Sequence, residues 1–455
     1  MAAQSDLRLS ASQTAAAVRD GRIRAEDLTR ACLERIEARE GEVQAWAFLD
    51  PEHALRQARD LDEHRRRGRP LGPLHGMPVG VKDIIDTADM PTENGTVLHA
   101  GRRPHQDATL VSLLRAAGAV ILGKTVTTEL AVYSPGKTRN PHDLERTPGG
   151  SSSGSAAAVA DGMVPLAIGT QTNGSVIRPA SFCGVYGFKP SHGLIPRTGV
   201  LAQSPPLDTV GVMAADLEGL AFLAEPLMAF DAKDPASQPR ARPQLLEVLR
   251  APPPVPPRLA FVRSPVWDQA AEDAKAGFAE LVDALGERVE EVALSASFDD
   301  AIEIHRMIME ADLAKSFARE YESGGDKLTS RLREMIERGR EVRAVDYNRA
   351  VARIAILNTV LAEFFSSYDA ILTPAAPGEA PSGLGSTGSP VFCTIWTLCG
   401  TPSVTLPLLT GASGLPIGVQ LVGEKGDDAR LLRTARWLIE SVRASGRPAE
   451  AELRS

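Results

Sequence analysis

The sequence predicts an α/β protein in which a mixed β-sheet is covered by helices. Short apolar runs at residues 79–85, 120–122 and 164–168 alternate with helical stretches such as residues 109–117, and such alternation is typical of an α/β sheet. The composition agrees with this class, because 43% of the 455 residues are hydrophobic and 24% are charged, as in ordinary globular proteins.

The first 65 residues predict an outer helical layer. Leu28, Cys32 and Ile36 recur every four positions, with charged residues on the other faces, which is the pattern of an amphipathic helix. We therefore expect residues 1–65 to pack as helices on the sheet that follows them.

Residues 66–230 are predicted to form the core, and a Pro-rich surface crossing at residues 231–258 follows it. The crossing ends in the run from Pro252 to Pro257, which cannot continue a helix or a central strand. Residues 259–455 are predicted to complete the sheet and the substrate pocket, with long amphipathic helices over residues 298–366. All four segments are expected to form one compact domain.

The net charge of −8 is unfavourable for binding nucleic acid, because contacts with phosphate need a positive face. The basic run from His64 to Arg69 has no interleaved aromatic residues and is expected to be a solvated loop. The N-terminal residues contain neither a signal-peptide apolar core nor a membrane span, so a cytoplasmic location and no membrane partner are expected.

The four cysteines indicate no metal site. Cys32, Cys183, Cys393 and Cys399 are scattered without a CxxC pair or a nearby histidine cluster, which is unlike a zinc site. Reduced thiols are expected, and neither a metal nor a cofactor is predicted.

Two Gly/Ser-rich loops carry the candidate nucleophiles. Residues 147–155 run directly into an apolar helix start and then into a strand, whereas a flexible linker would join separable units. A loop of this kind presents free backbone N–H groups at a helix N-terminus. No GxxxxGK[ST] pattern is present, which argues against a phosphate loop. A second loop of small residues, 169–179, contains Ser175.

A lysine is the candidate base for these serines. None of the eight histidines lies in a recognisable triad motif, and no GxSxG elbow occurs. Lys82 lies within the strand-like apolar run 79–85, where burial would lower its pKa and leave a neutral amine that accepts a proton. Without other evidence, the simpler interpretation of Lys82 is a lysine at a strand end whose amine reaches solvent. Its assignment as a base therefore depends on the segments around it.

Lys82 and the two serine loops together resemble the amidase signature family, and the resemblance extends over nearly the whole chain. The matching segments occur in the family order, from the lysine region through the Gly/Ser loop to the C-terminal end of the signature. They are residues 71–83, 116–125, 140–155, 182–190, 207–211 and 414–421. The resemblance implies a mixed α/β sheet and a hydrolase that cleaves carboxamides.

The resemblance assigns the catalytic roles residue by residue. The nucleophile falls on Ser175, the bridging serine on Ser151 and the base on Lys82. Neutral Lys82 would take a proton from Ser151, which would take one from Ser175. Ser152 and Ser153 lie in the same loop but out of register with the family spacing, and we interpret them as loop structure. The bridging serine of the family follows a cis peptide, which would here be the bond before Ser151.

The oxyanion hole is expected at the backbone N–H groups of Thr172, Asn173, Gly174 and Ser175. Most family members have glycine at the position of Asn173. Asparagine tolerates left-handed geometry better than other non-glycine residues, so the loop is expected to keep its shape. Its side chain would add bulk and a hydrogen-bonding group beside the hole, so the substrate choice of the family does not carry over at this position.

Arg178 and Thr170 are the predicted substrate-binding residues. The segments Ser175–Pro179, Ser386–Gly388 and Trp396–Leu398 look most like the malonamidase branch of the family, in which an arginine three residues after the nucleophile contacts a substrate carboxylate. A guanidinium suits a carboxylate through bidentate hydrogen bonds. Alternatively, Arg178 braces the loop through backbone carbonyls.

The resulting prediction is an amidase that hydrolyses the C–N bond of a small carboxamide through a Ser-cisSer-Lys acyl-enzyme mechanism. The carboxamide would also bear a carboxylate if Arg178 binds one. An amidase for neutral aryl or alkyl amides is one alternative, and the glutaminase subunit of a tRNA-dependent amidotransferase is another. A catalytically inactive scaffold is disfavoured because all three triad positions are filled. By resemblance to the family, the protein is also expected to form a homodimer.

Overall fold

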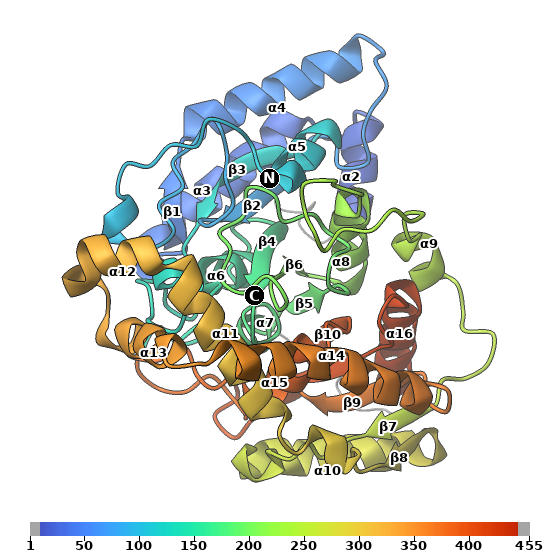
Figure 1. Cartoon of the computed structure of the whole chain (residues 1–455). Coiled ribbons are helices and arrows are strands. Elements are labelled where there is room, and N and C mark those ends of the chain that lie inside the picture. Colours follow the sequence, from blue (N-terminus) through green and yellow to red (C-terminus); the bar gives the residue numbers. More distant parts are fainter. Residues whose placement is uncertain (1–9, 445–455) are drawn as a thin grey trace.

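The structure, a computed structural model, describes residues 10–444, and the strands among them form one large sheet (Figure 1). The strands are β1 (Trp46–Leu49), β2 (Pro78–Lys82), β3 (Val120–Thr125), β4 (Leu166–Gln171), β5 (Tyr186–Lys189), β6 (Thr209–Ala214), β7 (Leu259–Phe261), β8 (Val289–Glu291), β9 (Ala370–Pro374), β10 (Ser403–Thr410) and β11 (Pro416–Val422).

The sheet is mixed. Its strand order is β1-β3-β2-β4-β6-β5-β10-β11-β9-β7-β8. β2 is parallel to both of its neighbours, β3 and β4, and β7 is parallel to β8 and β9, whereas the other neighbouring pairs are antiparallel. The predicted α/β class with a mixed sheet is confirmed.

Helices cover both faces of this sheet. They are α2 (Ala11–Arg19), α3 (Ala25–Val43), α4 (Pro51–Arg66), α5 (Thr109–Ala116), α6 (Ser153–Ala160), α7 (Ile177–Phe182), α8 (Leu217–Ala224), α9 (Leu245–Arg250), α10 (Glu272–Leu285), α11 (Ala301–Ser316), α12 (Ala318–Gly324), α13 (Ser330–Arg340), α14 (Ala344–Phe365), α15 (Val391–Leu398) and α16 (Asp428–Ala444). Short 3-10 turns, among them η2 (Val97–His99) and η3 (Glu129–Ala131), lie in the loops.

Side chains alternate along the strands and divide the core between the two faces. On β4, Leu166 and Ile168 pack with α5, α8 and α16, whereas Ala167 packs with α6 on the opposite face. On β2, Val81 belongs to the first of these faces. Lys82 is the next residue, so its side chain starts on the face that α6 covers.

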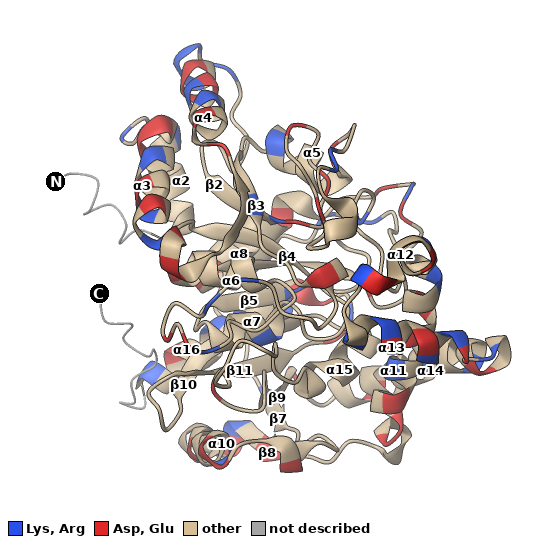
Figure 2. Cartoon of the chain, turned by 90° about the vertical axis from the view of Figure 1, so that its left-hand side faces the viewer, with Lys and Arg blue, Asp and Glu red and all other residues tan. Residues whose placement is uncertain are grey.

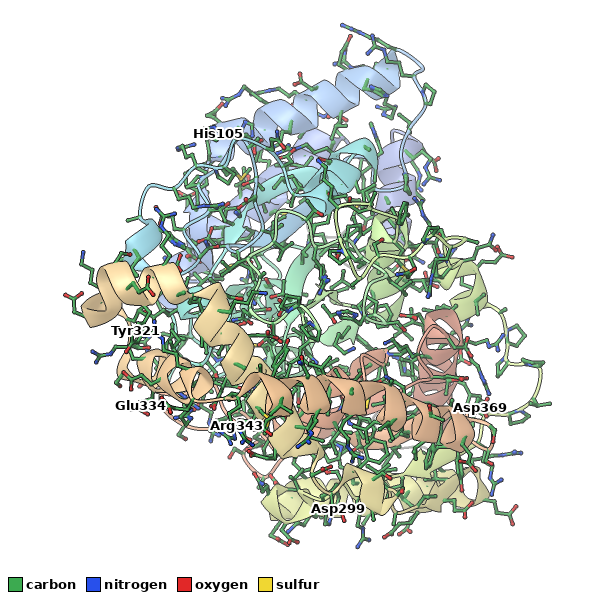
Figure 3. All side chains as sticks on the ribbon, viewed as in Figure 1. His105, Asp299, Tyr321, Glu334, Arg343 and Asp369 are labelled. Carbon is green, nitrogen blue, oxygen red and sulfur yellow. The ribbon has the colours of Figure 1, made fainter. Side chains whose placement is uncertain are left out.

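The predicted helices of residues 298–366 form a subregion of their own, made by α11 to α14. α11 packs against α13, α14 and α15, and α14 runs across the front of the molecule in Figure 1. Charged residues lie mainly on outer helices such as these (Figure 2). Glu334 on α13 and Arg343 before α14 mark the outer surface of the subregion in Figure 3.

Two elements lie in segments for which the sequence predicted a different structure. β1 lies within the helical layer expected for residues 1–65, where it pairs with β3 at the edge of the sheet. The chain turns into β1 at Gln44, which caps α3 with a left-handed φ of 55°. α9 lies within the crossing expected for residues 231–258, and it is held by Leu245 and Leu249, which are buried against α8 and α16.

Candidate active site

Lys82 lies at the end of β2, between two parallel neighbours. β3 and β4 flank it on either side, and the side chain is fully buried. Its Nζ lies 2.7 Å from Ser151 Oγ and 2.8 Å from Thr170 Oγ1. Three segments that are far apart in the sequence therefore meet at this amine.

Burial lowers the pKa of Lys82 well below its ordinary value. Asp208 raises this pKa and Arg178 lowers it, but desolvation is the largest of the three effects. The lowered pKa favours the neutral amine, which has a lone pair and two N–H bonds. One N–H binds Thr170 Oγ1, which leaves the lone pair in a position to accept the proton of Ser151.

Ser151 is the serine of its loop that faces the lysine. The peptide bond before it is cis, as the resemblance implied. The hydroxyl of Ser152 donates to Thr170 O at 3.3 Å and accepts from the Thr170 N–H at 3.2 Å. The hydroxyl of Ser153 donates to a backbone carbonyl just after β3 at 3.3 Å. These two hydroxyls bind backbone groups, and only Ser151 binds the lysine.

Ser175 lies in the loop between β4 and α7, and 8% of its surface is exposed. Within residues 10–444 its hydroxyl forms no hydrogen bond, with Ser151 or with any other group. In unliganded enzymes, catalytic hydrogen bonds are often long and shorten when the substrate binds. The contact between Lys82 and Ser151 is thus formed in this structure, whereas the two serines are not hydrogen-bonded to each other.

Free backbone donors occur at Ser175 and at the residues just before it in the chain. The N–H groups of Thr172, Asn173, Gly174 and Ser175, predicted to form the oxyanion hole, donate no hydrogen bond in the described part of the chain. The next two N–H groups along the chain are bound by Gln171 Oε1 at 2.9 and 3.0 Å. Free donors next to a candidate nucleophile are what an oxyanion hole requires.

Asn173 has no left-handed backbone conformation, so its tolerance of that geometry is not what admits it here. Its side chain is held on both sides, because Nδ2 donates to Tyr133 Oη at 2.8 Å and Oδ1 accepts from Thr394 Oγ1 at 2.8 Å. Gly174 has no positive φ either. A Cβ on Gly174 would lie 2.9 Å from Pro390 Cβ, so close packing against α15 explains this glycine.

Arg178 is fully buried on α7 and binds backbone carbonyls. Its guanidinium donates to Gly150 O at 2.5 Å, to Gly388 O at 3.1 Å and to Thr387 Oγ1 at 3.2 Å. Burial lowers its pKa to about 10, and among residues 10–444 no carboxylate forms an ion pair with it. These contacts favour bracing of the loop before Ser151 over binding of a substrate carboxylate.

Asp208 is a buried carboxylate that we did not assign to the site from the sequence. The hydroxyl of Thr172 lies 2.6 Å from Asp208 Oδ1 and 2.5 Å from Gln203 Oε1. Asp208 Oδ2 accepts the N–H groups of Gln203 and Ser204 at 2.9 and 3.0 Å. Burial raises the pKa of Asp208 to about 6. A signal was present, since Asp208 lies within the matching segment 207–211.

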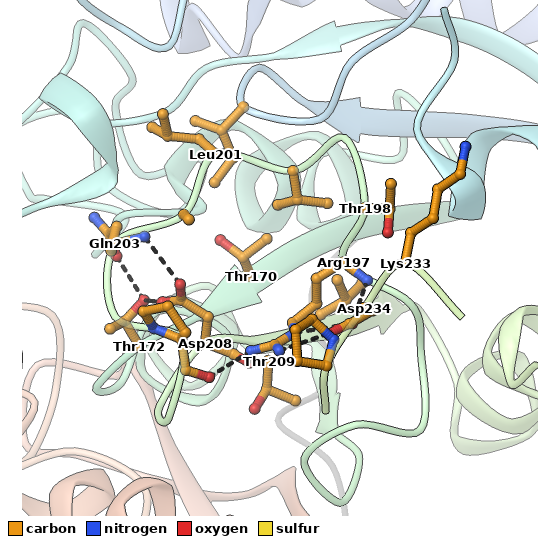
Figure 4. Close-up of a pocket in the computed structure, with 16 residues that line it drawn as sticks. Thr170, Thr172, Arg197, Thr198, Leu201, Gln203, Asp208, Thr209, Lys233 and Asp234 are labelled. Atoms are coloured by element: carbon orange, nitrogen blue, oxygen red, sulfur yellow. Dashed lines mark hydrogen bonds and ion pairs between the residues drawn. The ribbon is translucent and has the colours of Figure 1, made fainter. Parts of the chain in front are cut away.

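A cavity of about 210 Å³ opens beside this carboxylate (Figure 4). Its polar side carries Thr170, Thr172 and Asp208, and the ion pair between Arg197 and Asp234, 2.7 Å long, lines it as well. Apolar residues line much of the rest, namely Ile84, Val200, Leu201 and Val210. Thr170, predicted to bind substrate, therefore both binds the lysine amine and lines this cavity.

Other candidate features of the described residues are few. Within residues 10–444 no three His, Cys, Asp or Glu side chains cluster closely enough to hold a metal ion. None of the described helices combines the length and the apolar character that crossing a membrane requires. All four cysteines are buried and free.

Comparison with known families matches residues 27–432 to the family described as Amidase. Among relatives, a subunit of the Glutamyl-tRNA(Gln) amidotransferase of Chloroflexus aggregans (strain MD-66 / DSM 9485) is 34% identical over 94% of this chain and 94% of that protein. The corresponding subunit of Symbiobacterium thermophilum is 34% identical over 93% of this chain and 94% of that protein.

Solved structures are similar over almost the whole chain. A vestigial protein complex described as revealing the evolutionary origins of an s-triazine catabolic enzyme has a TM-score of 0.90 and 27% identity, covering 98% of this chain and 100% of that chain. The peptide amidase of Stenotrophomonas maltophilia has a TM-score of 0.82 and 29% identity, covering 98% and 99%. The 6-aminohexanoate cyclic dimer hydrolase with its substrate has a TM-score of 0.84 and 26% identity, covering 98% and 99%.

Proposed function

Because the chain belongs to the amidase family, we propose that it hydrolyses the C–N bond of a small carboxamide through an acyl-enzyme on Ser175. The observation that carries this proposal is the distance of 2.7 Å between Lys82 Nζ and Ser151 Oγ. Burial lowers the pKa of that amine. The pair supplies the base that a nucleophilic serine needs when no histidine serves it.

In the proposed reaction, Lys82 accepts the proton of Ser151 while Ser151 accepts that of Ser175, and Ser175 Oγ attacks the amide carbon. The carbonyl electron pair moves to oxygen, where the free N–H groups of residues 172–175 stabilise the charge. The carbonyl then re-forms, the C–N bond breaks, and the relay returns the proton to the leaving ammonia or amine. Water attacks the resulting ester by the same relay, which releases the carboxylic acid and restores Ser175.

Two measurements test this proposal directly. A fluorophosphonate probe is expected to form a covalent adduct on Ser175, with loss of fluoride, that peptide mass spectrometry locates. A panel of malonamate, propionamide, benzamide and glutamine, assayed for released ammonia, identifies the acyl group that is accepted. An adduct on another residue, together with no ammonia from any amide, would contradict the proposal.

Replacement of the loop serines one at a time is expected to separate their roles. Ser151→Ala should lower kcat by about 10³–10⁴, because it removes the proton carrier between base and nucleophile. Ser152→Ala and Ser153→Ala are matched controls, since each removes a hydroxyl that binds backbone, which typically costs about 1 kcal/mol of stability. Their kcat should stay within about tenfold of wild type. The reverse ranking in ammonia-release assays would move the relay to another serine.

Arg178→Met is expected to lower kcat/KM for acidic and neutral amides alike. The guanidinium contacts the carbonyls of Gly150 and Gly388, and charge-assisted hydrogen bonds are worth about 1.5–3 kcal/mol, or about 10- to 150-fold. Malonamate and propionamide form the matched pair of substrates. A loss confined to malonamate would instead assign Arg178 to a substrate carboxylate, as first expected for the malonamidase branch. An equal loss favours a neutral aryl or alkyl amide as the substrate.

A second candidate function is the glutaminase subunit of a tRNA-dependent amidotransferase. It is favoured by the relatives that are 34% identical over 94% of this chain and are named as one subunit of such an enzyme. This function requires glutamine to be the preferred amide and a partner subunit to copurify with the chain. Light scattering on the purified protein distinguishes such a complex from the homodimer that the family resemblance implies.

A further inference from the structure

Three consecutive carbonyl groups just before Ser175 each accept a hydrogen bond. The pairs are Thr172 O with His305 Nε2 at 2.9 Å, Asn173 O with Thr397 Oγ1, and Gly174 O with the Arg178 N–H at 2.9 Å. The third bond belongs to the start of α7, but the first two come from side chains on α11 and α15. Both helices lie far from this loop in the sequence.

A bound carbonyl fixes the direction of the N–H group on the same peptide. In a trans peptide the C=O and N–H bonds point in opposite directions, and every peptide of this loop is trans. A donor on the carbonyl of residue 172 therefore orients the N–H of residue 173, and a donor on the carbonyl of residue 173 orients the N–H of residue 174. These are the N–H groups that donate no hydrogen bond within the described residues.

We propose that His305 and Thr397 are positioning residues of the oxyanion hole, each holding one carbonyl so that the N–H group of the same peptide points to the substrate oxygen. This inference rests on the proposed function, because it takes Ser175 as the nucleophile. Neither side chain touches the reacting atoms, and both act through the loop backbone. The C-terminal half of the chain thus completes a site whose nucleophile and base lie in the first half.

Chemistry fixes the direction of both hydrogen bonds. A carbonyl oxygen only accepts, so His305 carries its proton on Nε2, and burial keeps the ring neutral by lowering its pKa to about 4. Thr397 Oγ1 accepts from Gln171 Nε2 at 2.9 Å, so its single proton is left for the carbonyl of Asn173. The amide of Gln171 is oriented in turn by two backbone N–H groups that donate to its Oε1.

Loss of either donor leaves a buried carbonyl unsatisfied. Such a group is costly, so rotation of the peptide toward another partner becomes favourable. Rotation also turns the N–H of that peptide out of the hole. The expected consequence is a lower rate of attack by Ser175, with substrate affinity largely unchanged.

Two matched pairs of variants test this role. His305→Phe and Thr397→Val remove the donor but keep much of the side-chain volume, whereas His305→Gln and Thr397→Ser retain a donor. The probe is a fluorophosphonate, because its phosphoryl oxygen enters the hole as Ser175 attacks phosphorus and fluoride leaves. We expect His305→Phe and Thr397→Val to lower the second-order labelling rate by about 10²–10³, the usual cost of one oxyanion donor. His305→Gln and Thr397→Ser should recover most of that rate.

Amide kinetics complete the test, and thermal unfolding shows whether each variant is folded. With the fastest substrate of the amide panel, His305→Phe and Thr397→Val should lower kcat while KM stays within about threefold of wild type. Labelling within twofold of wild type, or an equal loss in the donor-retaining variants, overturns the positioning role while Ser175 remains the labelled residue. If His305→Phe does not fold, the Thr397 pair decides, because Thr397→Val removes the hydroxyl and Thr397→Ser keeps it. Retained activity in Ser175→Ala would overturn the proposed function and this inference together.

Discussion

Replacement of Ser175 by alanine is expected to lower kcat by a factor of about 10⁶, the size of effect that loss of a serine nucleophile has in other hydrolases. The acyl-enzyme cannot form without the Ser175 hydroxyl. That hydroxyl makes no hydrogen bond within residues 10–444, so its removal leaves no buried partner unsatisfied. The variant should therefore unfold at the temperature of the wild type while releasing no measurable ammonia.

The fluorophosphonate adduct provides the control for this variant. Wild type should gain one adduct on the peptide that carries Ser175, and Ser175→Ala should gain none. Ser152→Ala serves as a matched alanine variant in the neighbouring loop, because its hydroxyl binds only the backbone of Thr170. Residual turnover in Ser175→Ala above about 1% of wild type would assign the nucleophile to another residue, since a lost nucleophile leaves far less.

Burial explains which parts of the fold could be predicted from the sequence. β3, β4, β9 and β11 are buried along their whole length, so each contains a short run of mostly apolar residues that the sequence reveals. β1 has four residues, of which only Trp46 is buried, and such a short pattern cannot be separated from the helices around it. α9 has six residues within a Pro-rich segment, where composition favours a crossing.

The candidate site divides in a similar way between local and distant residues. Lys82, Ser151 and Ser175 each lie in a distinctive local segment, so the sequence was enough to name them as candidates. His305 and Thr397 lie 133 and 224 positions from the residues whose carbonyls they bind, on helices with ordinary amphipathic or apolar patterns. Only the three-dimensional fold brings such partners together, so no local pattern could have identified them.

Lys82→Met is expected to lower kcat by about 10⁴, the upper range for a general base, because methionine keeps the length of the side chain but offers no lone pair of comparable basicity. Lys82→Arg should be hardly more active, since a guanidinium stays protonated and cannot accept the relay proton. Both variants should still be folded by circular dichroism and thermal unfolding. Near-normal turnover in Lys82→Arg would show that positive charge, rather than a base, is what this position requires.

The pH dependence of the wild-type rate also tests Lys82 as the base, because the mechanism predicts the direction in which the rate changes with pH. The neutral amine is the active form, so kcat/KM should fall about tenfold per pH unit as pH drops below the pKa of Lys82. Burial lowers that pKa and Asp208 raises it.

Asp208→Asn removes a charge that stabilises the ammonium form of Lys82, while an asparagine amide keeps hydrogen-bonding groups toward Thr172 and Gln203. The acid limb of the profile should therefore move to lower pH. The shift should be largest where the limb lies above pH 6, because Asp208, whose own pKa is about 6, is ionised there. A shift to higher pH would mean that the limb reports a group other than Lys82.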